Sequence, residues 1–131
     1  MIVLDTHALV WWVSDGSRLS DRARRAIRSA ARQGSIAASA ISLFEITTLM
    51  RRGRLTLAIP EDQWFADLRL LPELRFEPVS AEIARLAGSF DDAMPGDPAD
   101  RIIAATTIAL GSKLVTADER LRRAPRLQTV W

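Results

Sequence analysis

The sequence predicts an α/β fold in which helices cover both faces of a central, mainly parallel β-sheet. Short apolar segments, typical of buried strands, alternate along the chain with longer segments that carry helix start and stop signals. Strands that are apolar on both faces are typical of parallel sheets packed between helices. The chain has 131 residues, of which 48% are hydrophobic, so residues 1–131 are expected to form a single domain.

The strands are predicted from short, β-prone apolar runs, which lie at residues 2–4, 35–38, 76–79, 113–116 and 127–130. The helices are predicted from the residues that bound them. They lie at residues 6–13, 21–33, 43–52, from 60 to before 72, 81–90, 98–110, and in a short segment that ends at 123. Ser20 and Ser80 are typical N-caps, Asp97 is an N-cap before Pro98, and Gly34 is a typical helix end.

Four acidic residues are predicted to meet at the carboxyl edge of this sheet, where ligands of such folds bind. Asp5 follows the first strand and Asp118 follows the strand at 113–116, while Glu45 and Asp100 lie in the first turns of helices. Crowded carboxylates repel one another unless a cation or protons compensate them. Because Mg²⁺ and Mn²⁺ prefer oxygen ligands, the four acids predict a divalent-metal site that activates water against a phosphate.

Each of these acids also has a purely structural interpretation. Asp5 and Asp118 could cap the helices that follow them, and Asp100 could belong to the start of its own helix. The run from Ser42 to Glu45 matches a capping box, in which the glutamate reaches back to the N–H of the cap residue. A metal site explains all four acids together, whereas separate capping roles do not.

The composition excludes several other kinds of site. The chain has no cysteine and one histidine, which excludes disulfides, thiolate metal sites and cysteine nucleophiles. It has no phosphate-binding P-loop and no Gly-x-Ser-x-Gly motif. His7 is expected to pack or to support the site rather than to act as a ligand. The apolar N-terminus lacks the basic region of a signal peptide, and no run approaches the roughly 20 residues of a membrane span, so we expect a cytoplasmic protein.

Charge is distributed unevenly along the chain. Residues 1–60 carry nine basic and four acidic side chains, residues 61–100 carry three and ten, and residues 101–131 carry six and two. Most of the basic side chains are arginines, whose planar guanidinium groups suit phosphate recognition. Beside a set of acids, such clusters favour a polyanion bound through metal, although a solvated helix face is an equally good interpretation of any one cluster.

Four segments in a fixed order carry a family resemblance, and they are Ile2–Thr6, Ile41–Ile46, Asp97–Ala105 and Leu114–Asp118. In order and spacing they resemble PIN-domain proteins, and in particular VapC-type toxins of bacterial toxin–antitoxin pairs. The resemblance covers nearly the whole chain and implies a PIN-like α/β/α sandwich around a mainly parallel sheet. It implies that Asp5, Glu45 and Asp100 are the principal acids that hold Mg²⁺ or Mn²⁺, with Asp118 as a fourth, more variable acid.

The resemblance also implies an activity and partners. These are metal-dependent hydrolysis of RNA, a cognate antitoxin that blocks the acidic pocket, a homodimer, and contact with DNA only through the antitoxin. Thr6 and Thr116 match hydroxyl positions beside the metal. Arg101, directly after Asp100, could form an ion pair or touch phosphate.

Two other functions are compatible with parts of the sequence. A phosphatase of the haloacid-dehalogenase type also has a strand that ends in aspartate, but it needs a second aspartate where this chain has His7. A regulatory binding module would use the acids as caps and act through dimerisation and a DNA-bound partner. Five apolar residues are candidates for a dimer or antitoxin surface, although core packing is the commoner role of such residues: Trp11, Trp12, Phe44, Leu49 and Met50.

Overall fold

The computed structural model describes residues 1–131 and contains one five-stranded sheet in which every pair of neighbouring strands is parallel. The strands are β1 (Ile2–Leu4), β2 (Ile36–Ser39), β3 (Leu74–Glu77), β4 (Lys113–Val115) and β5 (Thr129–Val130). Their spatial order is β3-β2-β1-β4-β5, so the first strand of the chain is the central strand of the sheet. The predicted parallel sheet is therefore confirmed.

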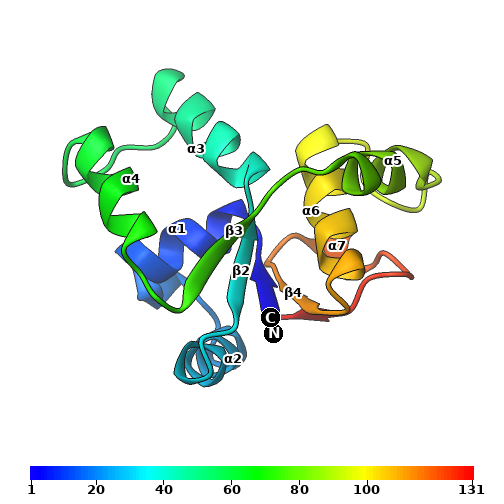
Figure 1. The fold of residues 1–131 in the computed structure, drawn as a ribbon, viewed down its shortest axis with the longest axis horizontal. Coiled ribbons are helices and arrows are strands. Elements are labelled where there is room, and N and C mark those ends of the chain that lie inside the picture. Colours follow the sequence, from blue (N-terminus) through cyan, green and yellow to red (C-terminus); the bar gives the residue numbers. More distant parts are fainter.

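Seven helices cover the two faces of the sheet. They are α1 (Thr6–Ser14), α2 (Asp21–Arg32), α3 (Ile41–Arg51), α4 (Glu61–Arg69), α5 (Ala81–Ser89), α6 (Pro98–Ala109) and α7 (Glu119–Arg122). In Figure 1, α1 and α4 lie to the left of the strands, α3 lies above them, α2 lies below them, and α5 to α7 lie to the right. This arrangement is the α/β/α sandwich expected from the sequence. None of the helices combines the length and the apolar character that crossing a bilayer requires.

The sheet separates two hydrophobic cores. Ile2 and Leu4 of β1 belong to the core formed with α1, α2 and α4, while Val3 faces the core formed with α5, α6 and α7. Successive side chains of a strand point to opposite faces, so a strand between two helix layers is apolar at every position. All three β1 residues are accordingly buried, which explains why the run has no polar alternation.

Several element boundaries differ from the prediction by one or two residues, and the contacts of two elements explain their shifts. The third strand begins and ends two residues earlier than expected, because Leu74 pairs with Ile36 of β2 and Pro78, which has no N–H, cannot continue the ladder. Helix α3 begins at Ile41 rather than at residue 43, and the Ser39 hydroxyl accepts a hydrogen bond from the Ile41 N–H at 3.2 Å. The short 3-10 helix Gly16–Arg18 was not predicted.

Replacing a core leucine tests the packing of the sheet. Leu114 is fully buried in β4, so Leu114→Ala should lower the free energy of unfolding by about 2–5 kcal/mol. Leu70, which is 78% exposed, supplies the matched control, because Leu70→Ala should change it by no more than about 0.5 kcal/mol. Urea unfolding followed by circular dichroism measures both values. Equal losses in the two variants would contradict this packing.

Candidate active site

The candidate site lies where the strand order reverses. Strand β2 lies beside β1 on one edge, and β4 lies beside β1 on the opposite edge. In parallel sheets the crevice outside the carboxyl ends of two such strands is the usual ligand site. A pocket of about 470 Å³ occupies this position, and it is lined by Asp5, Thr6, His7, Trp11, Glu45, Asp97, Asp100, Ala117 and Asp118. The structure thus brings all four predicted acids together.

Two of the acids are positioned by the helices that follow the strands. One oxygen of Asp5, Oδ1, accepts a hydrogen bond from the Ala8 N–H at 2.9 Å, which caps α1. Asp118 Oδ1 accepts hydrogen bonds from the N–H groups of Arg120 and Leu121, which caps α7. The capping interpretation and the pocket are therefore compatible. Each cap fixes the carboxylate at a helix N-terminus while the second oxygen, Oδ2, makes no such bond.

Glu45 does not form the predicted capping box. Ser42 lies inside α3, and the helix begins after Ala40 without a side-chain cap. The Glu45 carboxylate instead accepts a hydrogen bond from the Thr6 hydroxyl, and the Thr6 hydroxyl lies 2.9 Å from the Ser42 hydroxyl. Because α3 begins at Ile41, two residues before the predicted start, Ser42 is a buried residue inside the helix and not its cap. The capping-box interpretation was therefore wrong.

Asp97 is a fifth carboxylate of the pocket. Its Oδ1 accepts a hydrogen bond from the Asp100 N–H at 3.1 Å, which confirms the predicted N-cap of α6. The same residue also lines the pocket, a position that was not predicted from the sequence. Its place three residues before Asp100 could have indicated this, because residues i and i+3 share one face of a helix.

The pocket collects negative charge without a basic partner. No lysine or arginine lines it, and none of its acids belongs to a salt bridge. Burial raises the pKa of the Asp5 and Glu45 carboxyls, against the lowering effect of hydrogen bonds from Thr116 and Thr6 respectively. Burial, together with the charges of Asp97 and the other acids, raises the pKa of Asp100 to about 7.

The donor set fits a hard divalent cation. Five carboxylates line the pocket, and hard divalent cations prefer such oxygen ligands. Burial disfavours the charged forms of Asp5, Glu45 and Asp100, whereas a bound cation would favour them. As oriented, no three His, Asp or Glu side chains converge on one point as ligands. Mg²⁺ keeps several waters and needs only one or two carboxylates, so a three-carboxylate cage is not required.

Arg101 neither pairs with an acid nor faces the pocket. Its guanidinium donates hydrogen bonds to four backbone carbonyls, those of Ala87, Phe90, Asp91 and Pro95, and it belongs to no salt bridge. The ion pair that the sequence allowed for Arg101 is therefore not formed. Its bonds connect α6 to the end of α5 and to the loop that leads to Asp97.

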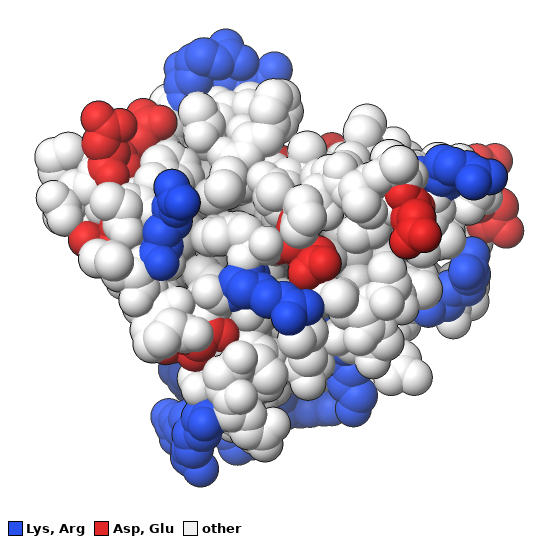
Figure 2. Space-filling model, in the orientation of Figure 1, with Lys and Arg blue, Asp and Glu red and all other residues white.

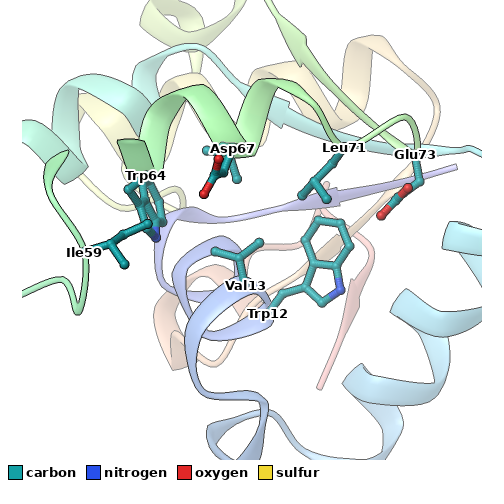
Figure 3. Close-up of a pocket in the computed structure, with 8 residues that line it drawn as sticks. Trp12, Val13, Ile59, Trp64, Asp67, Leu71 and Glu73 are labelled. Atoms are coloured by element: carbon teal, nitrogen blue, oxygen red, sulfur yellow. The ribbon is translucent and has the colours of Figure 1, made fainter. Parts of the chain in front are cut away.

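A second pocket lies between α1 and α4 and differs in chemistry. Its volume is about 370 Å³, and its mostly apolar lining includes Trp12, Val13, Trp64 and Leu71 (Figure 3). Of the five apolar candidates from the sequence, Trp12 lines this pocket, Trp11 lines the acidic one, and Phe44 is 68% exposed on α3. The second pocket suits apolar side chains rather than ions.

Exposed arginines form two clusters outside the acidic pocket, and Arg52 and Arg54 of one cluster line a neighbouring groove together with Glu45 and Asp97. In Figure 2 basic side chains gather over the end of α3 at the top and over α2 at the bottom. Seven exposed arginines of these segments make no salt bridge: Arg22, Arg25, Arg28, Arg32, Arg51, Arg52 and Arg54. They are available to bind the phosphates of a polyanion.

The fold and the acidic pocket are those of a nuclease-type α/β sandwich, and residues 2–127 match the family model described as the PIN domain. The chain belongs to the PIN-domain family. It is 41% identical over 132 residues to Ribonuclease VapC22 of Mycobacterium tuberculosis, with 99% of this chain and 98% of that protein covered.

Solved structures share the fold at low sequence identity. VapBC2 from Rickettsia felis, bound to a promoter DNA fragment, gives a TM-score of 0.71 at 23% identity over 98% of this chain and 97% of that one. FitAcB from Neisseria gonorrhoeae gives a TM-score of 0.67 at 21% identity over 98% and 96%. This chain therefore shares its overall fold with these solved structures.

The raised pKa of Asp100 predicts a pH-dependent stability in the absence of metal. Its folded-state pKa of about 7 exceeds the ordinary value of 3.8, so the folded chain binds more protons between these values. The free energy of unfolding therefore falls as the pH rises through this window. In chelator at pH 8, Asp100→Asn should raise the melting temperature by about 3 °C, a small effect because solvent screens a partly exposed group.

Thermal unfolding at pH 5 and pH 8 measures this effect. The melting temperature of Asp100→Asn should exceed that of the unmodified chain by more at pH 8 than at pH 5. Asp62→Asn, which removes an exposed charge of α4 outside the pocket, should shift both temperatures little. A variant that melts at or below the unmodified chain at pH 8 would contradict the charge repulsion described above.

Proposed function

We propose that the chain is a metal-dependent endoribonuclease that acts as the toxin of a toxin–antitoxin pair. One observation carries this proposal: five carboxylates line a single pocket that contains no lysine or arginine, in a PIN-domain chain. The 41% identity to a protein named Ribonuclease VapC22 supports RNA as the substrate. The whole chain, residues 1–131, then acts as one nuclease domain.

In this proposal Asp5, Glu45, Asp100 and Asp118 hold Mg²⁺ or Mn²⁺. When bound, such a cation activates a water and stabilises charge on the phosphate under attack. The caps of α1 and α7 hold Asp5 and Asp118 in place, and Thr6 holds Glu45. One carboxylate of the set accepts the proton of the attacking water.

The unpaired arginines supply the complementary surface. Those of α2 and of the end of α3 can bind the RNA backbone without reading bases. A cognate antitoxin is the partner that we propose, because the similar solved assemblies include a toxin–antitoxin complex from Klebsiella pneumoniae and DNA-bound VapBC assemblies. We further propose a homodimer in the cytoplasm, which reaches DNA only through the antitoxin.

Loss of one acid should abolish cleavage. Asp5→Asn or Asp100→Asn should each lower kcat/KM for RNA by at least about 100-fold. Losing a residue that only supports a metal ligand costs up to about 100-fold, and losing the ligand itself should cost at least as much. The rate should require Mn²⁺ or Mg²⁺ and should vanish in chelator. Initial rates with a fluorogenic RNA measure these effects.

Asp62→Asn is the matched control for this experiment, because it removes the same charge from an exposed helix start. Its rate should stay within twofold of the unmodified chain. Full activity of Asp5→Asn or Asp100→Asn, with intact folding, would show that the acids do not perform the chemistry.

Growth of an expressing bacterium separates the enzyme from a binding module. Induction of the chain should stop growth, Asp5→Asn should abolish the effect, and co-expression of the antitoxin should restore growth. Colony counts and RNA profiles after induction measure the outcome. Toxicity that survives Asp5→Asn would favour a protein that acts by binding alone.

A further inference from the structure

A row of three aromatic rings stands beside the acids. The His7 and Trp11 ring centroids are 5.7 Å apart, and those of Trp11 and Trp131 are 5.8 Å apart, with interplanar angles of 47° and 51°. His7 and Trp11 lie one turn apart on α1, and both line the acidic pocket. The row therefore leads from the end of β5 to the wall of the site.

Core packing accounts for only part of this row. Trp11 and Trp131 are half-buried against the core of α1 and α2, but His7 is exposed and ends the row on the pocket side. Ala8 and Leu9, between His7 and Trp11, are fully buried. Helix α1 thus uses one face for the core and presents a different, aromatic face to the pocket.

A guanidinium accompanies the row. The Arg18 guanidinium lies over the Trp11 ring, 5.9 Å from its centroid. Its side chain is 65% exposed, and its one carboxylate neighbour, Asp15, lies at the 4.0 Å limit of an ion pair. Trp11 and Arg18 also line a neighbouring groove, so Trp11 is the shared wall between that groove and the acids.

We propose that His7 and Trp11 form a stacking platform for an unpaired nucleobase of the RNA substrate, with Arg18 bound to an adjacent phosphate. The proposal rests on the ribonuclease function proposed above. Proteins bind single-stranded nucleic acid through aromatic rings that stack on bases and cations that follow the backbone. The row, the guanidinium and the acids provide a base site, a phosphate site and a reaction site side by side.

This arrangement selects the strand state of the substrate. In a duplex the bases stack within the helix, and recognition of individual bases requires unpaired loops or ends. The platform therefore favours cleavage within single-stranded segments, where one base next to the scissile phosphate can leave its neighbours and stack on the protein.

Steady-state cleavage by the full chain with Mn²⁺ tests the platform. The probe is a short single-stranded oligoribonucleotide, compared with the same strand annealed to its complement. Trp11→Leu and His7→Ala should each raise KM for the single strand by about 10-fold, the effect expected from losing one base-stacking contact, and change kcat less. Trp12→Leu is the matched control, because Trp12 is the next residue and lines the apolar pocket instead.

A set of substrates that each lack one base makes the test specific. For the unmodified chain, KM should rise when the missing base is the one at a particular RNA position near the scissile phosphate. Trp11→Leu should lose this dependence, since two changes that remove the same contact are not additive. His7, which is exposed, gives the same test without disturbing the core.

The outcomes separate the two proposals. Failure of the unmodified chain to cleave any RNA overturns the ribonuclease function and the platform together. Cleavage with unchanged KM in Trp11→Leu and His7→Ala, or with no dependence on any single base, overturns the platform alone. Loss of antitoxin neutralisation with unchanged KM would instead assign the row to a protein partner.

Discussion

Mutual repulsion among carboxylates is the constraint on which this molecule depends. Asp5, Glu45, Asp97, Asp100 and Asp118 line one pocket that no lysine or arginine enters. Burial there raises the pKa of Asp5 and Glu45, and burial with like charge raises that of Asp100 to about 7. Such a cluster costs stability, and the rest of the fold must hold it together. Two hydrophobic cores, one on each side of the sheet, supply the rigidity that this requires.

Helix N-termini solve much of the positioning problem. Asp5, Asp97 and Asp118 each accept hydrogen bonds from the first backbone N–H groups of a helix, those of α1, α6 and α7. Each of these residues marks the point where a strand or loop gives way to a helix. The same hydrogen bond that caps the helix also orients the carboxylate. A capping role at these positions therefore does not keep the carboxylate out of the pocket. A prediction that treats helix capping and a place in the pocket as mutually exclusive gives such acids too little weight.

The strands, the helices and the meeting of four acids were predictable, because apolar runs and caps are local signals. What failed depended on contacts between distant residues. Glu45 bonds to Thr6, 39 positions earlier, so the local match to a capping box was misleading. An ion pair was one possibility for Arg101, but the partners of its guanidinium are backbone carbonyls of the 87–95 segment. The aromatic row required Trp131 to return beside α1, which no local pattern indicates.

The central place of β1 has a consequence for how the protein is made. Strand β1 is synthesised before β4, yet Leu4 pairs with Val115 of β4, and Asp118 lies beyond that strand. Contacts of such long sequence separation form late and slowly. A chain emerging from the ribosome N-terminus first therefore has Asp5 but no complete pocket until β4 and α7 have left the exit tunnel. Nascent chains thus lack the assembled acids, and the potential to damage RNA arises only after synthesis of this last segment.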